Sequence, residues 1–197
     1  EAFTAPVSSI EQETSSFQEG GYYTIRNKHS FGVTRCATYR HRPAQADMLH
    51  FDLWHKGKNI LADAGTFSYN TDIDHVLYFN GTASHNTVMI DNKDQMKKAS
   101  RFIWLNWTKS KPIAFSQGSD YQLFEGEHYG YDRLTHRRGI LESGDQWVII
   151  DDLFGEFSND DISLNWLFGL SDVQQISDNE WLIDIDPDEK WKMVNYC

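Results

Sequence analysis

Hydrophobic residues in this chain recur mostly at every second position, in short runs that end at polar turn residues. This alternation is typical of β-strands that bury one face. It predicts strands over residues 22–27 (YYTIRN) and 32–40 (GVTRCATYR). It also predicts two hairpins, over residues 48–63 with a turn at 56–59, and over residues 137–153. Gly and charged residues divide each hairpin into two apolar arms, as expected for antiparallel strands.

Other segments of the chain have the same short, apolar character. Five of them are predicted strands: 86–91 (NTVMID), 112–118 (PIAFSQG), 121–128 (YQLFEGEH), 163–169 (SLNWLFG) and 180–185 (EWLIDI). The chain is therefore predicted to be all-β, with about a dozen strands in an antiparallel two-sheet β-sandwich of supersandwich-like form.

Two segments depart from the strand pattern. Residues 91–99 (DNKDQMKKA) are the only helical candidate, although no full apolar stripe runs along them. Residues 70–84 are polar and rich in turn residues, so they are predicted to form a long loop. Long ordered loops are often functional.

Length and charge narrow the class of protein. At 197 residues the chain suits one domain with a full core. Residues 1–21 are polar and lack an initiator Met, so we interpret them as a linker from a preceding domain and residues 22–197 as the folded domain. The net charge of −11 argues against a nucleic-acid partner, and no apolar run is long enough to predict a membrane span. Cys36 and Cys197 could pair or stay free.

Ionisable residues are dense in residues 43–65 (PAQADMLHFDLWHKGKNILADAG). The hairpin brings Asp63 beside the strand of His50, and His85 begins a strand that can pair nearby. Imidazole nitrogens and carboxylate oxygens bind divalent ions, and Gln45 could add an amide oxygen. The alternative is that these are ordinary surface or hydrogen-bonded residues, which is the commoner case for a histidine in a β-domain.

The spacing of two of these candidates raises a geometrical difficulty. Gln45 and His50 are separated by an odd number of residues, so a regular strand would point them to opposite faces. A bulge near Asp47 would allow both to face one site.

Other kinds of catalytic or binding site have less support in the sequence. The sequence contains no Gly-x-Ser-x-Gly motif and no glycine-rich phosphate loop. Adjacent acids such as Asp151 and Asp152 are interpreted as solvated turns, and residues 135–139 (THRRG) as a solvated strand face or an anion contact.

Four of the seven tryptophans fall into two groups. Trp147 and Trp166 stand in aliphatic strands and are expected in the core, where most aromatic residues of a β-sandwich lie. Trp104 and Trp107 stand in a mixed segment and could instead form an exposed platform for a sugar ring.

The stretches PAQADMLHFDLWHKGKNILADAGTFSYN, FNGTASHNTVMIDNKDQ and HYGYDRLTHRRGILE together resemble the β-domain of the heparinase II/III-like polysaccharide lyases, in particular the heparinase III group. This resemblance implies a β-sandwich joined to an N-terminal α/α toroid that is absent here, with the sugar cleft between the two domains. It implies β-elimination on an acidic uronate glycan such as heparan sulfate, and a periplasmic or secreted protein. The fragment alone is expected to be inactive, because the toroid carries an Asn and a Tyr of the proton chemistry.

The resemblance also implies site residues. The family's His-x-His, acid and His-Asn-Thr positions correspond to Pro43, Gln45, Asp63 and His85, so the His-x-His is not kept. We expect a divalent ion (Zn or Ca) at Gln45, His50, Asp63 and His85, and His50 as the catalytic histidine, with His41 as the alternative. Arg40, Arg42, Arg101 and Arg137 could supply local positive charge, although the toroid is the better source. The alternative function is a non-catalytic carbohydrate-binding β-sandwich, and a third is a purely structural domain.

Overall fold

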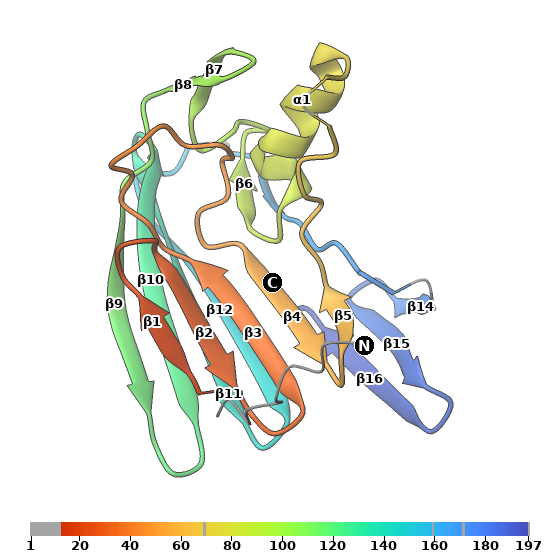
Figure 1. Cartoon of the computed structure of the whole chain (residues 1–197). Helices are drawn as coiled ribbons and strands as arrows, with labels where there is room; N and C mark the ends of the chain where they lie inside the picture. The colour runs from red at the N-terminus through yellow and green to blue at the C-terminus, as the bar shows by residue number, and fades with distance from the viewer. Residues whose placement is uncertain (1–12, 69, 159, 171, 197) are drawn as a thin grey trace, which may run out of the picture.

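The structure is a computed structural model that describes residues 13–68, 70–158, 160–170 and 172–196. Two larger antiparallel sheets form a sandwich (Figure 1). The first sheet has the strand order β1-β2-β3-β4-β5, with bounds Ser15–Phe17, Tyr22–Arg26, Ser30–Arg35, Phe51–His55 and Lys58–Leu61. The second has the order β12-β11-β10-β9, with bounds Gln146–Gly155, Leu134–Ser143, Gln122–Tyr131 and Ser110–Gln117. The predicted all-β sandwich is confirmed.

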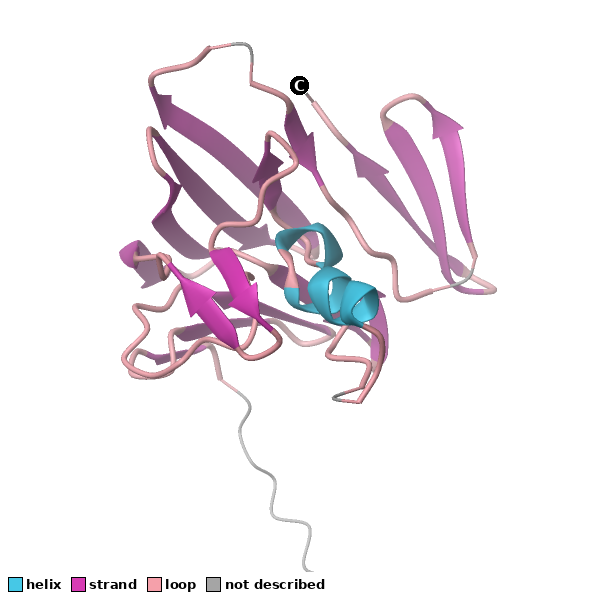
Figure 2. Cartoon of the chain, turned by 90° about the horizontal axis from the view of Figure 1, so that it is seen from above, coloured by secondary structure: helices cyan, strands magenta, loops and turns pink. Residues whose placement is uncertain are grey.

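Smaller sheets and one helix extend the sandwich. A three-stranded sheet has the order β14-β15-β16, with bounds Val173–Ser177, Glu180–Asp186 and Glu189–Val194. Two two-stranded sheets pair β13 (Ile162–Leu164) with β6 (Val88–Ile90), and β7 (Lys97–Ser100) with β8 (Ile103–Leu105). The helix α1 (Ile73–Asn80) and the 3₁₀ helix η1 (Thr82–Ser84) lie near the β7–β8 hairpin at one end of the molecule (Figures 1 and 2).

Two tight turns set the register of the predicted hairpins. Lys56 and Gly57 join β4 to β5, and Gly144 and Asp145 join β11 to β12. All four residues have positive φ, between 47° and 78°. Two-residue turns of this kind match the right-handed twist of paired strands, which explains why both hairpins were visible in the sequence. The first turn is two residues shorter than the predicted 56–59.

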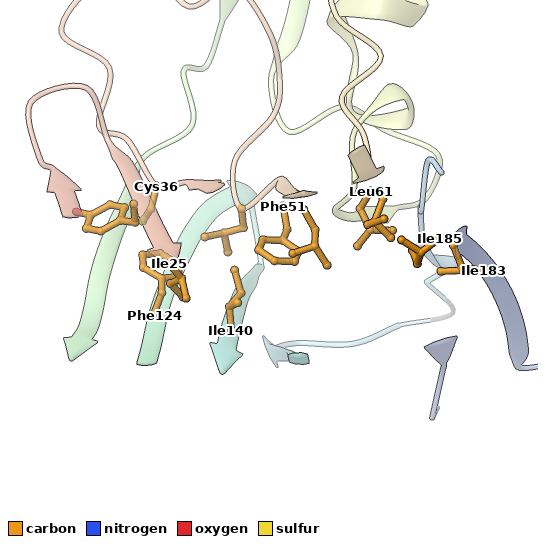
Figure 3. Packing of buried hydrophobic residues seen from close by; sticks show 12 residues of the cluster. Ile25, Cys36, Phe51, Leu61, Phe124, Ile140, Ile183 and Ile185 are labelled. Carbon is orange, nitrogen blue, oxygen red and sulfur yellow. The ribbon is translucent and has the colours of Figure 1, made fainter. Parts of the chain in front are cut away.

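The main core lies between the two larger sheets and continues toward β15 (Figure 3). Its buried side chains come from β2, β4, β5, β10, β11 and β15, with Cys36 just after β3 and Leu49 just before β4: Tyr23, Ile25, Cys36, Leu49, Phe51, Leu53, Ile60, Leu61, Phe124, Ile140, Ile183 and Ile185. Trp147 and Trp166 pack against this core, as expected. Cys36 is buried within it, whereas its possible partner Cys197 lies outside the described residues.

Trp104 and Trp107 do not form the exposed platform that was considered for them. Trp104 is buried against Ala46 and Met96, and its indole N–H donates to the carbonyl of Ala44 at 3.0 Å. Trp107 is 39% exposed, and its indole N–H donates to the carbonyl of Trp104 at 2.8 Å. Of these two residues, Trp107 alone keeps an accessible ring.

The predicted loop at 70–84 and the predicted helix at 91–99 are both wrong. The loop contains α1 and η1, and α1 escaped notice because it has only eight residues and buries only Val76. Residues 91–99 instead turn through Asp91 and Asn92, which both have positive φ, and then enter β7. Pairing of β7 with β8 outweighs the weak helical propensity of this segment.

The start of the folded domain differs from the expected residue 22. Strand β1 lies within the segment 1–21 that was interpreted as a linker, and it pairs with β2. Residues 1–12 of that segment lie outside the described residues. None of the described helices is both long and apolar enough to cross a bilayer.

Candidate metal centre

Three candidate ligands meet where three segments leave regular structure. Asp63 follows β5, His85 follows η1, and His50 directly precedes β4. One ligand atom of each residue lies within 4.8 Å of the other two. Within the described ranges of the chain, these are the residues of the His, Cys, Asp and Glu types that come together in a group of three.

Asp63 and His85 are in direct contact. Nδ1 of His85 lies 2.8 Å from Oδ2 of Asp63, and the backbone N–H of Gly65 donates to Oδ1 of Asp63 at 2.5 Å. Because an ionised carboxylate only accepts hydrogen bonds, Nδ1 of His85 carries the hydrogen and Nε2 carries the lone pair. That Nε2 is buried and has no hydrogen-bond partner. The expectation that these two side chains meet in space is confirmed.

His50 has the opposite tautomer. The backbone N–H of Asn86 donates to Nδ1 of His50 at 2.9 Å, so Nε2 of the neutral ring carries the hydrogen. This Nε2 lies 3.5 Å from Oδ2 of Asp63, beyond the usual N–H···O distance, and is also buried without a partner. His50 is therefore oriented as a donor toward Asp63. It can ligate a cation through Nε2 only by giving up the hydrogen bond from Asn86.

Burial and charge fix the protonation states of this group. Burial lowers the pKa of His50 to about 3, although the charge of Asp63 acts in the opposite direction. Burial opposes ionisation of Asp63, but the hydrogen bond and charge of His85 hold the pKa of Asp63 at about 2. At neutral pH the centre thus combines a carboxylate charge with a neutral His50. A cation is electrostatically favoured there.

Gln45 contacts the backbone two residues after Asp63, and it does not lie on a strand. The chain turns between Asp47 and His50, Leu49 has a φ of 59°, and β4 begins only at residue 51. Strand alternation does not apply here, and no bulge is needed. The amide nitrogen of Gln45 donates to the carbonyls of Gly65 (3.1 Å) and Phe79 (3.3 Å). Neither bond uses Oε1, the atom that could ligate a cation.

Asn86 joins the centre to the sandwich. Its side-chain amide nitrogen donates to the carbonyls of Phe51 and Ala62, each at 2.9 Å. Its Oδ1 accepts the backbone N–H of Leu167 at 2.5 Å. Together with the bond to His50, these contacts fix the position of the residue that follows His85. Asn86 is fully buried.

The buried side chain of Arg138 donates to the backbone carbonyl of Asn86. Nη1 of Arg138 donates to the carbonyls of Leu49 (2.7 Å) and Asn86 (2.6 Å). Its Nε and Nη2 donate to the two carboxylate oxygens of Asp151 at 2.7 and 2.9 Å. Nε2 of His136 lies 2.7 Å from Oδ1 of the same carboxylate. The charge of Arg138 is thus paired inside the sandwich.

Sequence reasoning missed this network. The expected solvated face at 135–139 is wrong for His136 and Arg138, which are both fully buried on β11. The expectation that Asp151 lies in a solvated turn is also wrong, because Asp151 is on β12 and paired with Arg138. The strict alternation of buried and half-buried positions along β11 could have revealed this, since Leu134 and Ile140 share the parity of His136 and Arg138.

The network ends at a second histidine. Nε2 of His128 lies 3.1 Å from Nδ1 of His136, and the backbone N–H of Gly130 donates to Nδ1 of His128 at 3.1 Å. Burial holds the pKa of His128 well below its ordinary range and also lowers the pKa of His136. By contrast His41, the alternative catalytic histidine, is exposed on the segment between β3 and β4 and lies outside the group of three.

The donor set fits a divalent cation at Asp63 and His85. The unpartnered, buried Nε2 of His85 and the ionised carboxylate of Asp63 are ligands of the type such ions select. The imidazole nitrogen favours Zn²⁺ over Ca²⁺, which prefers oxygen ligands. In the described hydrogen-bonding arrangement His50 fits as a supporting donor, because its Nδ1 is already an acceptor.

Comparisons with known proteins place the chain in context. A family model described as "Heparinase II/III-like, C-terminal" matches residues 10–194. A heparin-sulfate lyase of Bacteroides thetaiotaomicron is 28% identical over 185 residues, which cover 85% of this chain and 24% of that protein. A heparin-sulfate lyase of Bacteroides stercoris is 26% identical over 153 residues, which cover 74% of this chain and 22% of that protein. The chain thus spans about a quarter of the length of these relatives.

Solved structures agree with the fold. A heparinase III superposes with a TM-score of 0.77 at 19% identity, covering 91% of this chain and 28% of that one. A heparan sulfate lyase from Pedobacter heparinus superposes with a TM-score of 0.73 at 22% identity, covering 89% of this chain and 27% of that one. At these identities the superpositions show a shared β-sandwich.

Proposed function

The chain belongs to the heparinase II/III-like C-terminal domain family, and from this membership we propose that it is the β-domain of a lyase that cleaves uronate glycans such as heparan sulfate by β-elimination. The observation that carries the proposal is the Asp63–His85 contact, with the buried and unpartnered Nε2 of His85, in a chain matched by the family over nearly its whole length. Heparin-sulfate lyases are the relatives it resembles.

We assign the metal ligands to Gln45, Asp63 and His85. His50, the fourth candidate, directs its Nε2–H toward Asp63 and so keeps the carboxylate oriented, as the partners of metal ligands commonly do. A bound Zn²⁺ or Ca²⁺ would supply a fixed positive charge and cross-link the segments after β5 and η1. Proton transfer by His50 stays a prediction, and its burial and low pKa favour the supporting role.

The chemistry explains why a second domain is needed. The hydrogen removed in β-elimination lies α to a uronate carboxylate, and it becomes acidic only when that carboxylate's charge is neutralised. A base must then take this proton, and an acid must protonate the departing oxygen. Of the histidines in the centre, His50 is neutral and buried and His85 is committed to Asp63. We therefore propose that an N-terminal toroid supplies the acid and base, and that the whole protein acts on extracellular glycans in the periplasm or outside the cell.

Metal content tests the assignment. The purified chain is expected to hold about one divalent ion by elemental analysis, and Asp63→Ala and His85→Ala are expected to lose it, since three or four convergent ligands are needed. His41→Ala is the matched control, because His41 is exposed and lies outside the centre. A metal-free chain that still binds oligosaccharide would instead favour the carbohydrate-binding module.

Activity tests the dependence on a second domain. Heparan sulfate is incubated with this chain and with a protein that also carries the toroid, and unsaturated uronate is followed by ultraviolet absorbance. We expect product only with the longer protein. Product formed by the chain alone would contradict the role assigned to the toroid.

A further inference from the structure

A cationic pocket lies beside the candidate metal centre. It has a volume of about 140 Å³ and is lined by side chains from the segment before β4, the segment after β5, α1 and the β7–β8 hairpin. Figures 1 and 2 show α1 and the hairpin at the same end of the molecule. Its charged lining residues are Arg42, Lys98 and Arg101.

The charge in this pocket is unusual for the chain. The net charge of the protein is −11, yet none of the described residues that line the pocket is acidic. Lys98 is half-buried with its ammonium 4.0 Å from the centre of the Trp104 ring. Burial lowers the pKa of Lys98, Asp94 opposes this change, and the charge of Arg42 lowers the pKa further. The repulsion between two like charges would be relieved by an anion placed between them.

The three cations are held in place by different contacts. Arg101 donates from Nη2 to the carbonyl of Thr71 at 2.9 Å. The guanidinium of Arg42 lies 5.7 Å from the centre of the Phe102 ring, which also lines the pocket. Lys98 and Arg101 are therefore half-buried at the pocket wall, and Arg42 is the exposed cation of the three.

Two segments of the chain contribute to both the pocket and the metal centre. Pro43 and Ala44 line the pocket and directly precede Gln45. Thr66 lines it from the segment that follows Asp63, and the carbonyl of Gly65 accepts a hydrogen bond from Gln45. The segments that carry Gln45 and Asp63 therefore continue directly into the wall of the cationic pocket.

We propose that this pocket binds an oxyanion group of the glycan, a uronate carboxylate or a sulfo group, on a sugar residue next to the one at the metal centre. This assignment rests on the proposed function and adds the residues that would recognise the acidic substrate. Carboxylates and sulfo groups both accept charge-assisted hydrogen bonds from Arg and Lys. The pocket is too small for a whole chain of sugars and suits one such group with part of its ring.

Binding of defined oligosaccharides to the 197-residue chain tests the pocket. Isothermal titration is carried out with a heparan sulfate tetrasaccharide and with an unsulfated tetrasaccharide that carries only carboxylates. Arg42→Gln and Lys98→Met are expected to weaken binding about 10-fold or more, because each removes one charged donor. Lys190→Met and Arg133→Gln are the controls, since both residues are half-exposed cations already paired with acids elsewhere.

The outcomes separate the two proposals. A loss seen with both sugars identifies the carboxylate as the ligand, and a loss confined to the sulfated sugar identifies the sulfo group. Unchanged affinity in Arg42→Gln and Lys98→Met, with tight binding by the unaltered chain, overturns the pocket and leaves the proposed function standing. An unaltered chain that binds neither sugar also overturns the pocket, and the proposed function is then decided by the metal and activity tests. Thermal unfolding checks that each variant is folded, and Arg42→Gln is the safer variant because Arg42 is exposed.

Discussion

Replacing Arg138 by Met tests whether the candidate centre depends on the buried network behind it. The substitution keeps the apolar stem but removes the charge and all four hydrogen bonds of the guanidinium. Asp151, whose side chain is only 14% exposed, would keep His136 as its charge-stabilising partner. The carbonyl of Leu49 would lose its buried donor, whereas the carbonyl of Asn86 would keep the backbone N–H of Phe51 at 3.3 Å.

The magnitude follows from these losses. Breaking one partner of a buried ion pair costs about 3–5 kcal/mol, and the carbonyl of Leu49, left without its donor, adds about 1–3 kcal/mol. Since a domain of this kind has a total stability of about 5–15 kcal/mol, Arg138→Met should lose at least about 4 kcal/mol and a large share of its stability. The double variant Arg138→Met with Asp151→Leu should recover part of this loss, because it also removes the unpaired carboxylate.

Urea unfolding followed by tryptophan fluorescence measures the effect, and Arg137→Met is the matched control. Arg137 precedes Arg138 on the same strand but points to the other face, where its 35% exposed side chain pairs with Glu127 at 2.9 Å. The side chain of Glu127 is only 9% exposed, but it also accepts a hydrogen bond from the hydroxyl of Tyr129, so the loss of Arg137 leaves it a partner and should cost less than the loss of Arg138. Equal losses of unfolding free energy in Arg137→Met and Arg138→Met would refute the role given to the buried network.

Two further predictions concern the sandwich itself. The pKa of His128 lies well below its ordinary range in the folded chain. As the pH falls, His128 is therefore protonated at a higher pH in the unfolded chain than in the folded chain. The unfolding free energy should therefore decrease below about pH 6.5, and more steeply in the unaltered chain than in His128→Gln; parallel pH profiles would contradict this. Gly32→Ala should cost about 1–3 kcal/mol, because a Cβ there would lie 2.8 Å from ring carbons of Phe51 and Trp147. Gly139→Ala is its control, since no atom lies within 4 Å of that Cβ, and thermal melts that shift equally in both would show that crowding is not the cause.

Much of the strand pattern could be predicted from the sequence, for a physical reason. In β11 and β12 one face of each strand is more buried than the other, and the turn between them contains Gly144 with positive φ. The apolar alternation and the turn residue therefore indicate the same hairpin. Short elements whose existence depends on tertiary contacts gave no such signal. β1 has three residues and α1 buries one side chain, so neither could be separated from polar loop sequence.

The site was predictable only in part. The Asp63–His85 contact followed from two motifs and their family resemblance, and it is present at 2.8 Å. The roles of Arg138 and Asp151 were not foreseen, because a charged residue in a strand is usually solvated. Pairing across β11 and β12, which only the structure supplies, makes their burial possible.

The anchoring of Asn86 has a consequence for how this domain could diversify. Among the described residues, the hydrogen-bond partners of its side chain and carbonyl lie on β4 or β11, directly after β5, or at Leu167. None of these partners lies on α1 or the β7–β8 hairpin. Substitutions on the exposed faces of the helix and the hairpin should therefore leave the position of Asn86 unchanged. Changes to α1 would act instead on Gln45, whose amide nitrogen donates to the carbonyl of Phe79, so the positions of His85 and Gln45 depend on different parts of the fold.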